Sequence, residues 1–388
     1  MKNSPRPRWR HSGKAPAASS FEWLRRILLL LAVLLVMGAC PWGSPPAHAA
    51  WKSVGPANVW ILALAIDPKT PATLYAATSK SGIYGTTNGG SSWKKVNSGL
   101  RVDAYITALA VNPKSSSTLF AGTNGNGIFR SSNGGASWKK YSSGLSDPYI
   151  YSLVVDPKSP STVYTGTDRA GVFKSTNNGQ KWKQAGSGLP DSKIIALAID
   201  PKTTGTLYAG TWGDGIYKTT NGGTTWKAVN SSLTNGNIYC IAVDPRNPRI
   251  LYAGTYGSGV FKSSNAGSGW KKVNTGLTDS SVIALAIDPK TTATLYAGTS
   301  SKGVFKSINS GSKWNRVSTG LKDNQISALA IDPKTTSTLY AGTWSKGVFK
   351  STGSGAAAGA SGAWMPLSDD TLTEDIPGAL AGPDLSDP

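Results

Sequence analysis

The chain has 388 residues, with 40 Lys and Arg against 20 Asp and Glu, which gives a formal net charge of +20 at pH 7. Charge of this sign favours anionic partners, such as polysaccharides, lipid head groups or cell-wall polymers. The composition includes only two His and two Cys, so chemistry that needs imidazole or thiol groups would depend on very few positions.

Residues 1–49 are predicted to be a signal peptide. The basic pair Arg25-Arg26 precedes an apolar run over 27–39, and Ala47-His48-Ala49 matches a signal-peptidase site. The apolar run is too short for a membrane span. An alternative is a lipoprotein signal, in which Met37 to Cys40 is the lipobox and Cys40 is lipidated. Both interpretations export the protein, to the periplasm or the extracellular space, which argues against a nucleic-acid partner.

Cleavage after Ala49 would remove much of the reactive chemistry. His11, His48 and Cys40 leave with the signal, so the mature chain keeps one cysteine, Cys240. This excludes Ser-His-Asp and Cys-His catalysis, histidine-ligated metals and intrachain disulfides. We therefore expect no metal and no cofactor. Cys240, in the apolar string IYCIAV, is predicted to be a small buried hydrophobe.

A unit of about 44 residues then repeats along the chain, marked by an Asp-Pro or Asn-Pro dipeptide. The first step is 45 residues and each later step is 44. The dipeptides begin at Asp67, Asn112, Asp156, Asp200, Asp244, Asp288 and Asp332. A fixed period in this range indicates one supersecondary unit stacked on copies of itself.

Each unit is predicted to contain four short strands. In the unit around Asp200, apolar runs at 194–200, 206–211, 216–219 and 226–229 are separated by turn signals, and no helical period occurs. Four-stranded units of this length are typical of a β-propeller. We expect an all-β, seven-bladed β-propeller over residues 50–367. The last residues, 368–388, carry six acids and no base and are predicted to be a disordered tail.

The segment between the third and fourth strands carries a family motif. In the first copy it reads Thr86-x-Asn88-x-Gly90-x-Ser92-Trp93. It resembles the Asp-box, or BNR, repeat of sialidase-like propellers, including relatives of the photosystem II assembly factor. Further copies lie at Ser131/Asn133/Gly135/Trp138, Ser175/Asn177/Gly179/Trp182, Thr219/Asn221/Gly223/Trp226, Asn265/Gly267/Trp270 and Asn309/Gly311/Trp314. The resemblance implies a hairpin whose Asn bonds the turn backbone and whose Trp packs into the blade.

The seventh unit lacks this motif after Ser351. Two segments could supply its fourth strand, Trp51–Val54 and Trp364–Leu367, and the spacing favours the N-terminal one. The outer strands carry lysines, which would protect the sheet edges from pairing with other chains. These are Lys94, Lys95, Lys139, Lys140, Lys183, Lys227, Lys271 and Lys272.

Candidate binding residues are sought where the copies differ, in the connections between second and third strands. Trp212, Tyr256 and Trp344 share one repeat position and would point to one face. We expect them to bind a ligand together with Arg169, Lys80, Lys302 and Lys346. The alternative is that each aromatic ring packs on its own turn.

The opposite face is predicted to carry one cation per blade, two residues after each Asp or Asn of the repeat marker. These residues could contact an anionic surface, or they could be ordinary solvated turn residues. They are Lys69, Lys114, Lys158, Lys202, Arg246, Lys290 and Lys334.

Enzymatic activity is not expected. Residues 51–367 contain no Glu, so the apparatus that the sialidase resemblance would imply is missing. If the protein were a glycoside hydrolase, the carboxylates peculiar to single copies, Asp168 and Asp214 together with Asp103, would be the candidates. By contrast, Asp147, Asp191, Asp279 and Asp323 recur in a GLxD pattern, which indicates turn chemistry.

The sequence therefore predicts a monomeric, secreted, non-enzymatic propeller that binds a protein or an anionic cell-envelope polysaccharide. Two alternatives stay open: a glycoside hydrolase, and an assembly factor for a membrane protein complex, as the photosystem II relative implies. Membrane contact would require lipidation of Cys40 or a peripheral association.

Overall fold

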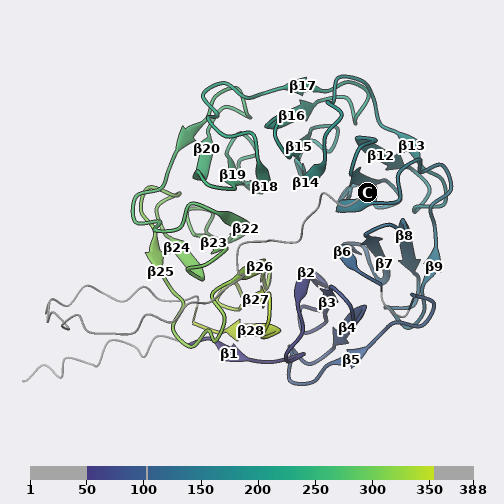
Figure 1. The fold of residues 1–388 in the computed structure, drawn as a ribbon, viewed down its shortest axis with the longest axis horizontal. Coiled ribbons are helices and arrows are strands. Elements are labelled where there is room, and N and C mark those ends of the chain that lie inside the picture. The colour runs from purple at the N-terminus through teal and green to yellow at the C-terminus, as the bar shows by residue number, and fades with distance from the viewer. Residues whose placement is uncertain (1–49, 102–103, 354–388) are drawn as a thin grey trace, which may run out of the picture.

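The computed structural model describes residues 50–101 and 104–353. These residues form seven antiparallel four-stranded sheets arranged in a ring (Figure 1). The prediction of an all-β, seven-bladed β-propeller is confirmed. The segments proposed as a signal peptide and an acidic tail lie outside the described residues.

The first strand of each blade lines the centre of the ring, and the second strand lies behind it (Figure 1). The first strands are β2 (Ile61–Ile66), β6 (Ile106–Asn112), β10 (Ile150–Val155), β14 (Ile194–Ile199), β18 (Ile238–Val243), β22 (Val282–Ile287) and β26 (Ile326–Ile331). The second strands are β3 (Leu74–Thr78), β7 (Ser115–Thr123), β11 (Val163–Thr167), β15 (Leu207–Thr211), β19 (Leu251–Thr255), β23 (Leu295–Thr299) and β27 (Leu339–Thr343).

The third and fourth strands complete each blade toward the outside. The third strands are β4 (Ile83–Thr86), β8 (Ile128–Ser131), β12 (Val172–Ser175), β16 (Ile216–Thr219), β20 (Gly259–Ser263), β24 (Val304–Ser307) and β28 (Val348–Ser351). The fourth strands are β5 (Lys94–Lys95), β9 (Lys139–Lys140), β13 (Lys183–Gln184), β17 (Lys227–Ala228), β21 (Lys271–Lys272), β25 (Asn315–Arg316) and β1 (Lys52–Ser53). We number the blades one to seven in the order of their first strands.

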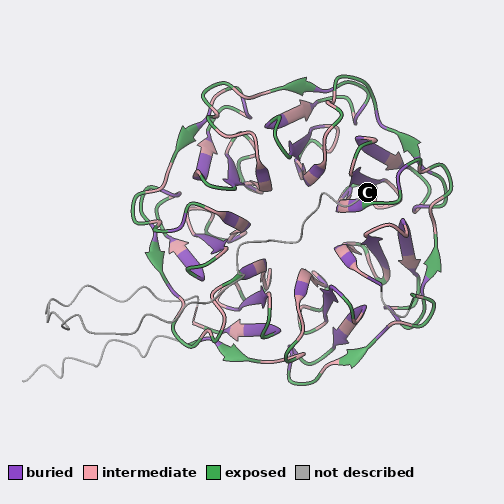
Figure 2. Cartoon of the chain, in the orientation of Figure 1, coloured by how far each residue is buried: buried purple, intermediate pink, exposed green. Residues whose placement is uncertain are grey.

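Burial follows this order. Strands of the LYAGT type, such as β15 and β19, are buried over their whole length because neighbouring blades cover both of their faces. The outer strands are two residues long and exposed (Figure 2). Short, lysine-bearing outer strands offer little edge for another chain to pair with, as predicted.

The ring closes through the N-terminal segment. Strand β1 pairs antiparallel with β28, with Lys52 opposite Lys350 and Ser53 opposite Phe349. The prediction that Trp51–Val54 supplies the seventh fourth strand is confirmed, whereas Trp364–Leu367 lies outside the described residues. The last blade is therefore built from both ends of the propeller.

The hairpin between third and fourth strands is held as the motif predicts. Asn88 Oδ1 accepts hydrogen bonds from Ser92 N at 2.9 Å and Thr86 Oγ1 at 2.8 Å. The tryptophan differs from the expectation, because it lies between blades rather than within one. Trp138 of blade two donates from Nε1 to Val96 O of blade one at 2.7 Å, and Trp51 of blade seven donates to Val317 O of blade six at 2.6 Å. Its indole thus joins neighbouring blades.

Candidate functional site

The propeller presents two different faces. The connections from second to third strand, and from fourth strand to the next blade, lie on one face, which we call the loop face. The turns between first and second strands and the hairpins between third and fourth strands lie on the other, which we call the turn face. This alternation follows from the antiparallel order of each blade.

A repeated Thr-x-x-x-Gly pattern shapes the loop face. Each second strand ends in a buried threonine whose hydroxyl donates to the carbonyl of the glycine four residues later. In blade four, Thr211 Oγ1 donates to Gly215 O at 2.9 Å, and Gly215 has a φ of 81°, which favours glycine. The residue after the threonine is therefore fixed at the end of the strand rather than carried on a loose loop.

These residues meet the residue that precedes the first strand of the same blade. In blade four the amide of Trp212 donates to Lys193 O at 3.0 Å, and the same contact occurs in every blade. We call the two sets together the rim. The rim consists of Ser79, Asn124, Asp168, Trp212, Tyr256, Ser300 and Trp344 after the second strands, and Trp60, Tyr105, Tyr149, Lys193, Asn237, Ser281 and Gln325 before the first strands.

A β-bulge follows at the start of every first strand, as in β14, where the register shifts between Ile194 and Ala196. A bulge leaves its extra residue unpaired and re-aims its side chain. Because the bulge recurs in all seven blades, it is a feature of the fold. The amino acid at the unpaired bulge position, however, differs between blades. In blades three and five the bulge residue is a tyrosine, Tyr151 and Tyr239.

Carboxylates of the GLxD pattern hold the loop connections in place, as predicted. Asp147 accepts hydrogen bonds from the amides of Tyr149, Arg169 and Ala170. Burial alone would raise the pKa of Asp279, but hydrogen bonds from the amide of Ser281 and from Ser301 hold it below its ordinary value. These groups act as loop anchors and are satisfied by the protein itself.

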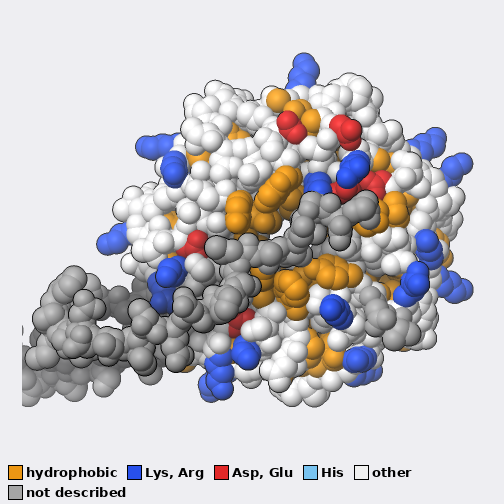
Figure 3. All heavy atoms as spheres, in the orientation of Figure 1, with side chains coloured by type: hydrophobic (Ala, Val, Ile, Leu, Met, Phe, Trp, Pro, Cys, Tyr) orange, Lys and Arg blue, Asp and Glu red, His pale blue; other side chains and the backbone are white. Residues whose placement is uncertain are grey.

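The first cluster on the rim is aromatic. Ring centroids lie 5.4 Å apart for Trp212 and Tyr239, 5.9 Å for Trp212 and Tyr256, and 5.7 Å for Tyr239 and Tyr256. We call these three residues the aromatic triad. Trp212 and Tyr256 keep 36% and 49% of their surface exposed. Figure 3 shows hydrophobic side chains gathered around the central opening.

Trp344 does not join this cluster, although it shares the repeat position. It lies against Trp60 of blade one, with ring centroids 5.1 Å apart. Trp212 and Tyr256 lie on neighbouring blades, four and five, whereas Trp344 lies on blade seven. The predicted aromatic set is therefore divided into two clusters on the same face, each completed by a ring that the sequence analysis did not select.

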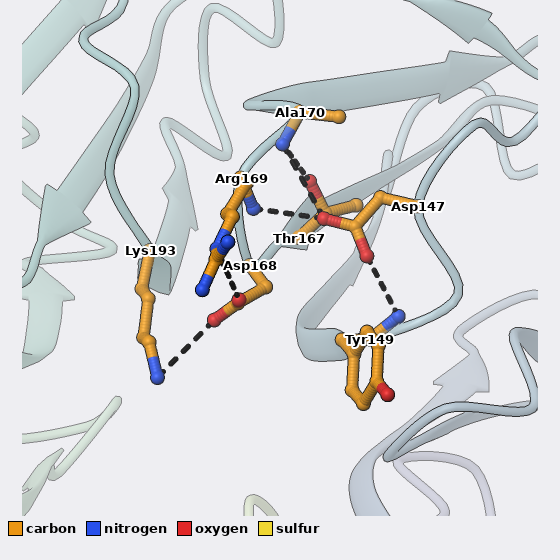
Figure 4. A network of polar contacts seen from close by, with 7 residues as sticks. All are labelled: Asp147, Tyr149, Thr167, Asp168, Arg169, Ala170 and Lys193. Atoms are coloured by element: carbon orange, nitrogen blue, oxygen red, sulfur yellow. Dashed lines mark hydrogen bonds and ion pairs between the residues drawn. The ribbon is translucent and has the colours of Figure 1, made fainter. Parts of the chain in front are cut away.

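The second cluster is polar and surrounds Asp168 (Figure 4). Lys193 Nζ lies 3.3 Å from Asp168 Oδ1, and Arg169 Nε lies 3.4 Å from Oδ2. Lys193 Nζ also lies 5.7 Å from the centre of the Tyr151 ring. Burial raises the pKa of Tyr151, and the charge of Asp168 and a hydrogen bond to it raise it further. Tyr151 therefore stays protonated and donates to the carboxylate.

Asp214, the other hydrolase candidate, is exposed on blade four, where its amide bonds Thr211 Oγ1. Asp168, on blade three, is partnered by two cations. Asp103 lies outside the described residues. The predicted ligand contacts Lys80, Lys302 and Lys346 are exposed on blades one, six and seven, whereas the aromatic triad lies on blades four and five.

On the turn face the predicted cations follow one another around the ring. Lys158 Nζ donates to Lys202 O at 2.6 Å, and Lys69 Nζ donates to Lys114 O at 2.8 Å. Lys114, Lys202, Lys290 and Lys334 make the equivalent bond to the next blade. Each ammonium thus has a structural partner, and contact with an anionic surface stays a prediction.

Two surface hollows lined by described residues lie apart from the rim clusters. A shallow depression of about 600 Å³ lies between blades two and three and is lined by residues that include Asn126, Lys140 and Pro148. A second, of about 460 Å³, includes Lys174 and Lys181 near the hairpins of blades three and four. Both depressions are open to solvent. The rim clusters are therefore a more specific arrangement of side chains than either depression.

The rim position before each first strand and the bulge position were not predicted from the sequence. The predicted ligand residues all came from the connections between second and third strands. An alignment of the seven copies would have shown that the residue before the first strand varies between blades. Trp60, Tyr149 and Lys193 are among the residues at this position. The bulge itself has no sequence signal, so Tyr151 and Tyr239 could be found only from the structure.

Neither a metal site nor a membrane span is visible in the part of the chain that the structure describes. Residues 50–101 and 104–353 contain no group of three or more His, Cys, Asp or Glu placed to hold a metal ion. The same residues contain no helix with the length and apolarity that crossing a bilayer requires.

Comparison with known proteins identifies the fold but not the family. One family model, described as Sortilin-Vps10 (sortilin, neurotensin receptor 3), matches residues 126–252, less than half of the chain. No curated protein matches the sequence. None of the descriptions names an Asp-box, so that resemblance stays a prediction.

Solved structures with the same fold carry different descriptions. A GH74 enzyme from Niastella koreensis has a TM-score of 0.65 at 21% identity, over 80% of this chain and 55% of its own. YCF48 bound to D1 peptide has a TM-score of 0.62 at 14% identity, over 79% of this chain and 99% of its own. The extracellular domain of a protein from B. thetaiotaomicron, described as a hybrid two-component system, has a TM-score of 0.61 at 16% identity, over 78% of this chain and 40% of its own. This chain is therefore similar to the seven-bladed propellers in these structures, and it spans about half of the length of the GH74 enzyme.

Proposed function

We propose that this protein is an exported, non-enzymatic propeller that binds a protein or an anionic cell-envelope glycan through its loop face. The observation that carries the proposal is the aromatic triad, because two of its rings stay exposed while every neighbouring second strand is buried. Exposed aromatic side chains clustered on one face are typical of binding surfaces. The rim also differs from blade to blade, as an asymmetric partner would require.

A binding experiment with cell-envelope extracts and the secreted full-length protein tests this proposal. The variant Trp212→Ala/Tyr256→Ala/Trp344→Ala should lose capture of the partner by at least about 30-fold, because aromatic anchors dominate interface energies. Replacing exposed edge lysines, as in Lys94→Ala/Lys95→Ala, serves as the control. Unchanged affinity of the aromatic variant would mean that the loop face is not the binding surface.

The hydrolase alternative is weakened by the surroundings of Asp168. A glycosidase needs one carboxyl group that holds a proton and a second that is ionised, at a short separation. Asp168 is paired with Lys193 and Arg169, and Asp214 belongs to a different blade. We expect no glycan hydrolysis. If hydrolysis is found, Asp168→Asn and Asp214→Asn must abolish it for these residues to be the pair.

The assembly-factor alternative gains only the agreement in size with YCF48, a structure of which contains D1 peptide. Capture of a membrane-protein peptide by the loop face, rather than of a glycan, would favour it. The same aromatic variant reports on both, so the binding function is tested whichever partner is found.

A further inference from the structure

The hollow between the hairpins of blades three and four is lined by charges of one sign. Its volume is about 460 Å³, and its lining includes three lysines, Lys174, Lys181 and Lys183. The described residues that line it include no Asp and no Glu. We call this hollow the lysine pocket. Its hairpins belong to the turn face, so it is separate from the aromatic triad on the loop face.

The three lysines have neutral partners or none. Lys174 Nζ donates to Gly222 O at 3.1 Å and lies 5.2 Å from the centre of the Tyr164 ring. Among the described residues, none makes a hydrogen bond or an ion pair with the side chain of Lys181 or of Lys183, and both lysines are exposed. An ammonium group has three N–H donors, so each of these lysines keeps donors for a ligand.

The carboxylates of blades three and four do not cancel this charge. On the turn face they are Asp156 and Asp200. Burial lowers the pKa of Lys218 and the charge of Asp200 opposes this, so Asp200 acts on a lysine of its own blade. Asp156 has the same repeat position relative to Lys174, and its Oδ1 accepts two backbone amides at 2.8 and 3.0 Å. The other carboxylates of these blades belong to loop-face connections. With Asp156 counted in full, three ammonium groups therefore face one carboxylate.

Blade three differs from the other blades at this place. Ala185 follows its outer strand, where the other six blades have Val or Tyr, and the smaller side chain leaves room beside the next hairpin. Lys181 precedes the motif tryptophan, where blades one, two and four have Ser or Thr. Blade six shares only a lysine at that position, Lys313, and has Asn315 and Val317 in its outer segment. The pocket thus combines features that occur together in blade three.

We propose that the lysine pocket binds the phosphate group of a ligand. Lysine acts as a point charge with rotatable donors, which suits an oxyanion approached from several sides. A phosphomonoester carries about 1.5 to 2 negative charges at pH 7, close to the excess that remains after Asp156 is counted. The hydroxyl of Thr176, also in the lining, is a further donor. Because the pocket is open, the rest of the ligand can extend into solvent. This site does not depend on the loop-face function proposed above.

Calorimetric titration of the full-length protein at low salt tests the proposal with pyrophosphate, glycerol 3-phosphate and glycerol. We expect both phosphates to bind and glycerol not to bind. Lys181→Gln should weaken binding by about tenfold, because it removes a hydrogen bond between charged groups. Lys313→Gln makes the same change at the same repeat position of blade six and should leave the affinity unchanged. Added salt should weaken binding by the wild type.

A second variant changes the shape of the pocket and not its charge. Ala185→Val introduces the residue that blade four carries at this position, Val229, so the melting temperature should not fall. We expect it to weaken the binding of glycerol 3-phosphate. Vesicles of phosphatidylcholine with phosphatidic acid then distinguish the source of the phosphate. Capture by these vesicles that is lost in Lys181→Gln assigns a lipid head group, and binding of glycerol 3-phosphate without capture assigns a soluble ligand.

The remaining outcomes contradict the proposal. Absence of binding to both phosphates and to the vesicles would remove the assignment. An equal loss in Lys313→Gln would indicate a general effect of net charge, and full affinity in a folded Ala185→Val variant would place the phosphate outside the pocket. A loss of phosphate binding in Trp212→Ala would move the site to the loop face. None of these results changes the test of the loop-face partner, so the two proposals can fail separately.

Discussion

At the residue scale, the fold lowers the reactivity of the Cys240 thiol. It lies on β18, and its Sγ approaches Val282 O of the neighbouring blade at 3.9 Å. Burial raises the pKa of the Cys240 thiol to about 12. The thiolate is the reactive form, so the half-buried thiol of Cys240 reacts slowly at neutral pH.

We therefore expect Cys240 to resist a disulfide reagent such as Ellman's reagent at pH 8 in the folded protein, and to react within minutes in guanidinium chloride. The absorbance of the released thiol measures both. Rapid stoichiometric reaction without denaturant would contradict the burial of Sγ and would make Cys240 a candidate for intermolecular pairing.

At the element scale, neighbouring blades are joined by second-strand tyrosines. Tyr208 OH of blade four donates to Ala266 O in the hairpin of blade five at 3.3 Å. Blades one, three, five and seven make the same bond. Blade two has Phe120 at this position, and the equivalent acceptor, Asn178 O, is reached by Arg130 instead, at 3.2 Å. The joint between blades two and three thus lacks one hydroxyl donor.

Phe120→Tyr should raise the free energy of unfolding by about 1 kcal/mol, because it adds a hydrogen bond that blades one, three, four, five and seven make. Tyr208→Phe should lower it by a similar amount, about 1 kcal/mol. Denaturant midpoints of the two variants and the wild type measure these changes. A destabilised Phe120→Tyr variant would indicate that the hydroxyl does not fit at this joint.

Strand β1 is a second element whose effect can be measured. Trp51 is 3% exposed and packs between blades six and seven, whereas Lys52 on the same strand is exposed. Trp51→Ala should destabilise the protein by about 3–5 kcal/mol, because it leaves a cavity where the ring closes. Lys52→Ala is the control and should change the melting temperature little. Equal melting temperatures for the two variants would show that closure does not depend on β1.

The fold was largely predictable at this scale. The Trp51–Val54 segment matched the missing fourth strand because it repeats the local pattern of every other copy. The position of each tryptophan between two blades was not predictable, since it depends on how the blades pack. The same distinction applies to the site, where Trp212 and Tyr256 were found by their repeat position but Tyr239 was not.

For the whole molecule, the tyrosine joints predict how stability depends on pH. Burial raises the pKa of Tyr208, Tyr252 and Tyr340 from 10.0 to about 12, and the charges of nearby aspartates add to this for each of them. An acid whose pKa is higher in the folded state stabilises the fold below its unfolded pKa. That contribution is lost as the pH rises from 10 to 12.

Burial lowers the pKa of Lys218, Lys262 and Lys306, which acts in the opposite direction, because the folded state then prefers the neutral amine. The tyrosine shifts are the larger, so we expect the urea midpoint to fall steeply between pH 10 and 12. In Tyr208→Phe the fall should be shallower, since one linked proton is removed. A fall as steep as that of the wild type would show that this tyrosine is not linked to folding.

The sequence by itself determined the blade number, the strands of each blade, the protected edges and the strand that closes the ring. These features follow from local patterns that repeat at a fixed period, so each copy supports the assignment of the others. Only the tertiary structure decided which side chains meet on the loop face. Lys193 with Asp168, Tyr239 with Trp212 and Trp60 with Trp344 each join two blades, and their contacts depend on blade packing and on the bulge rather than on sequence distance.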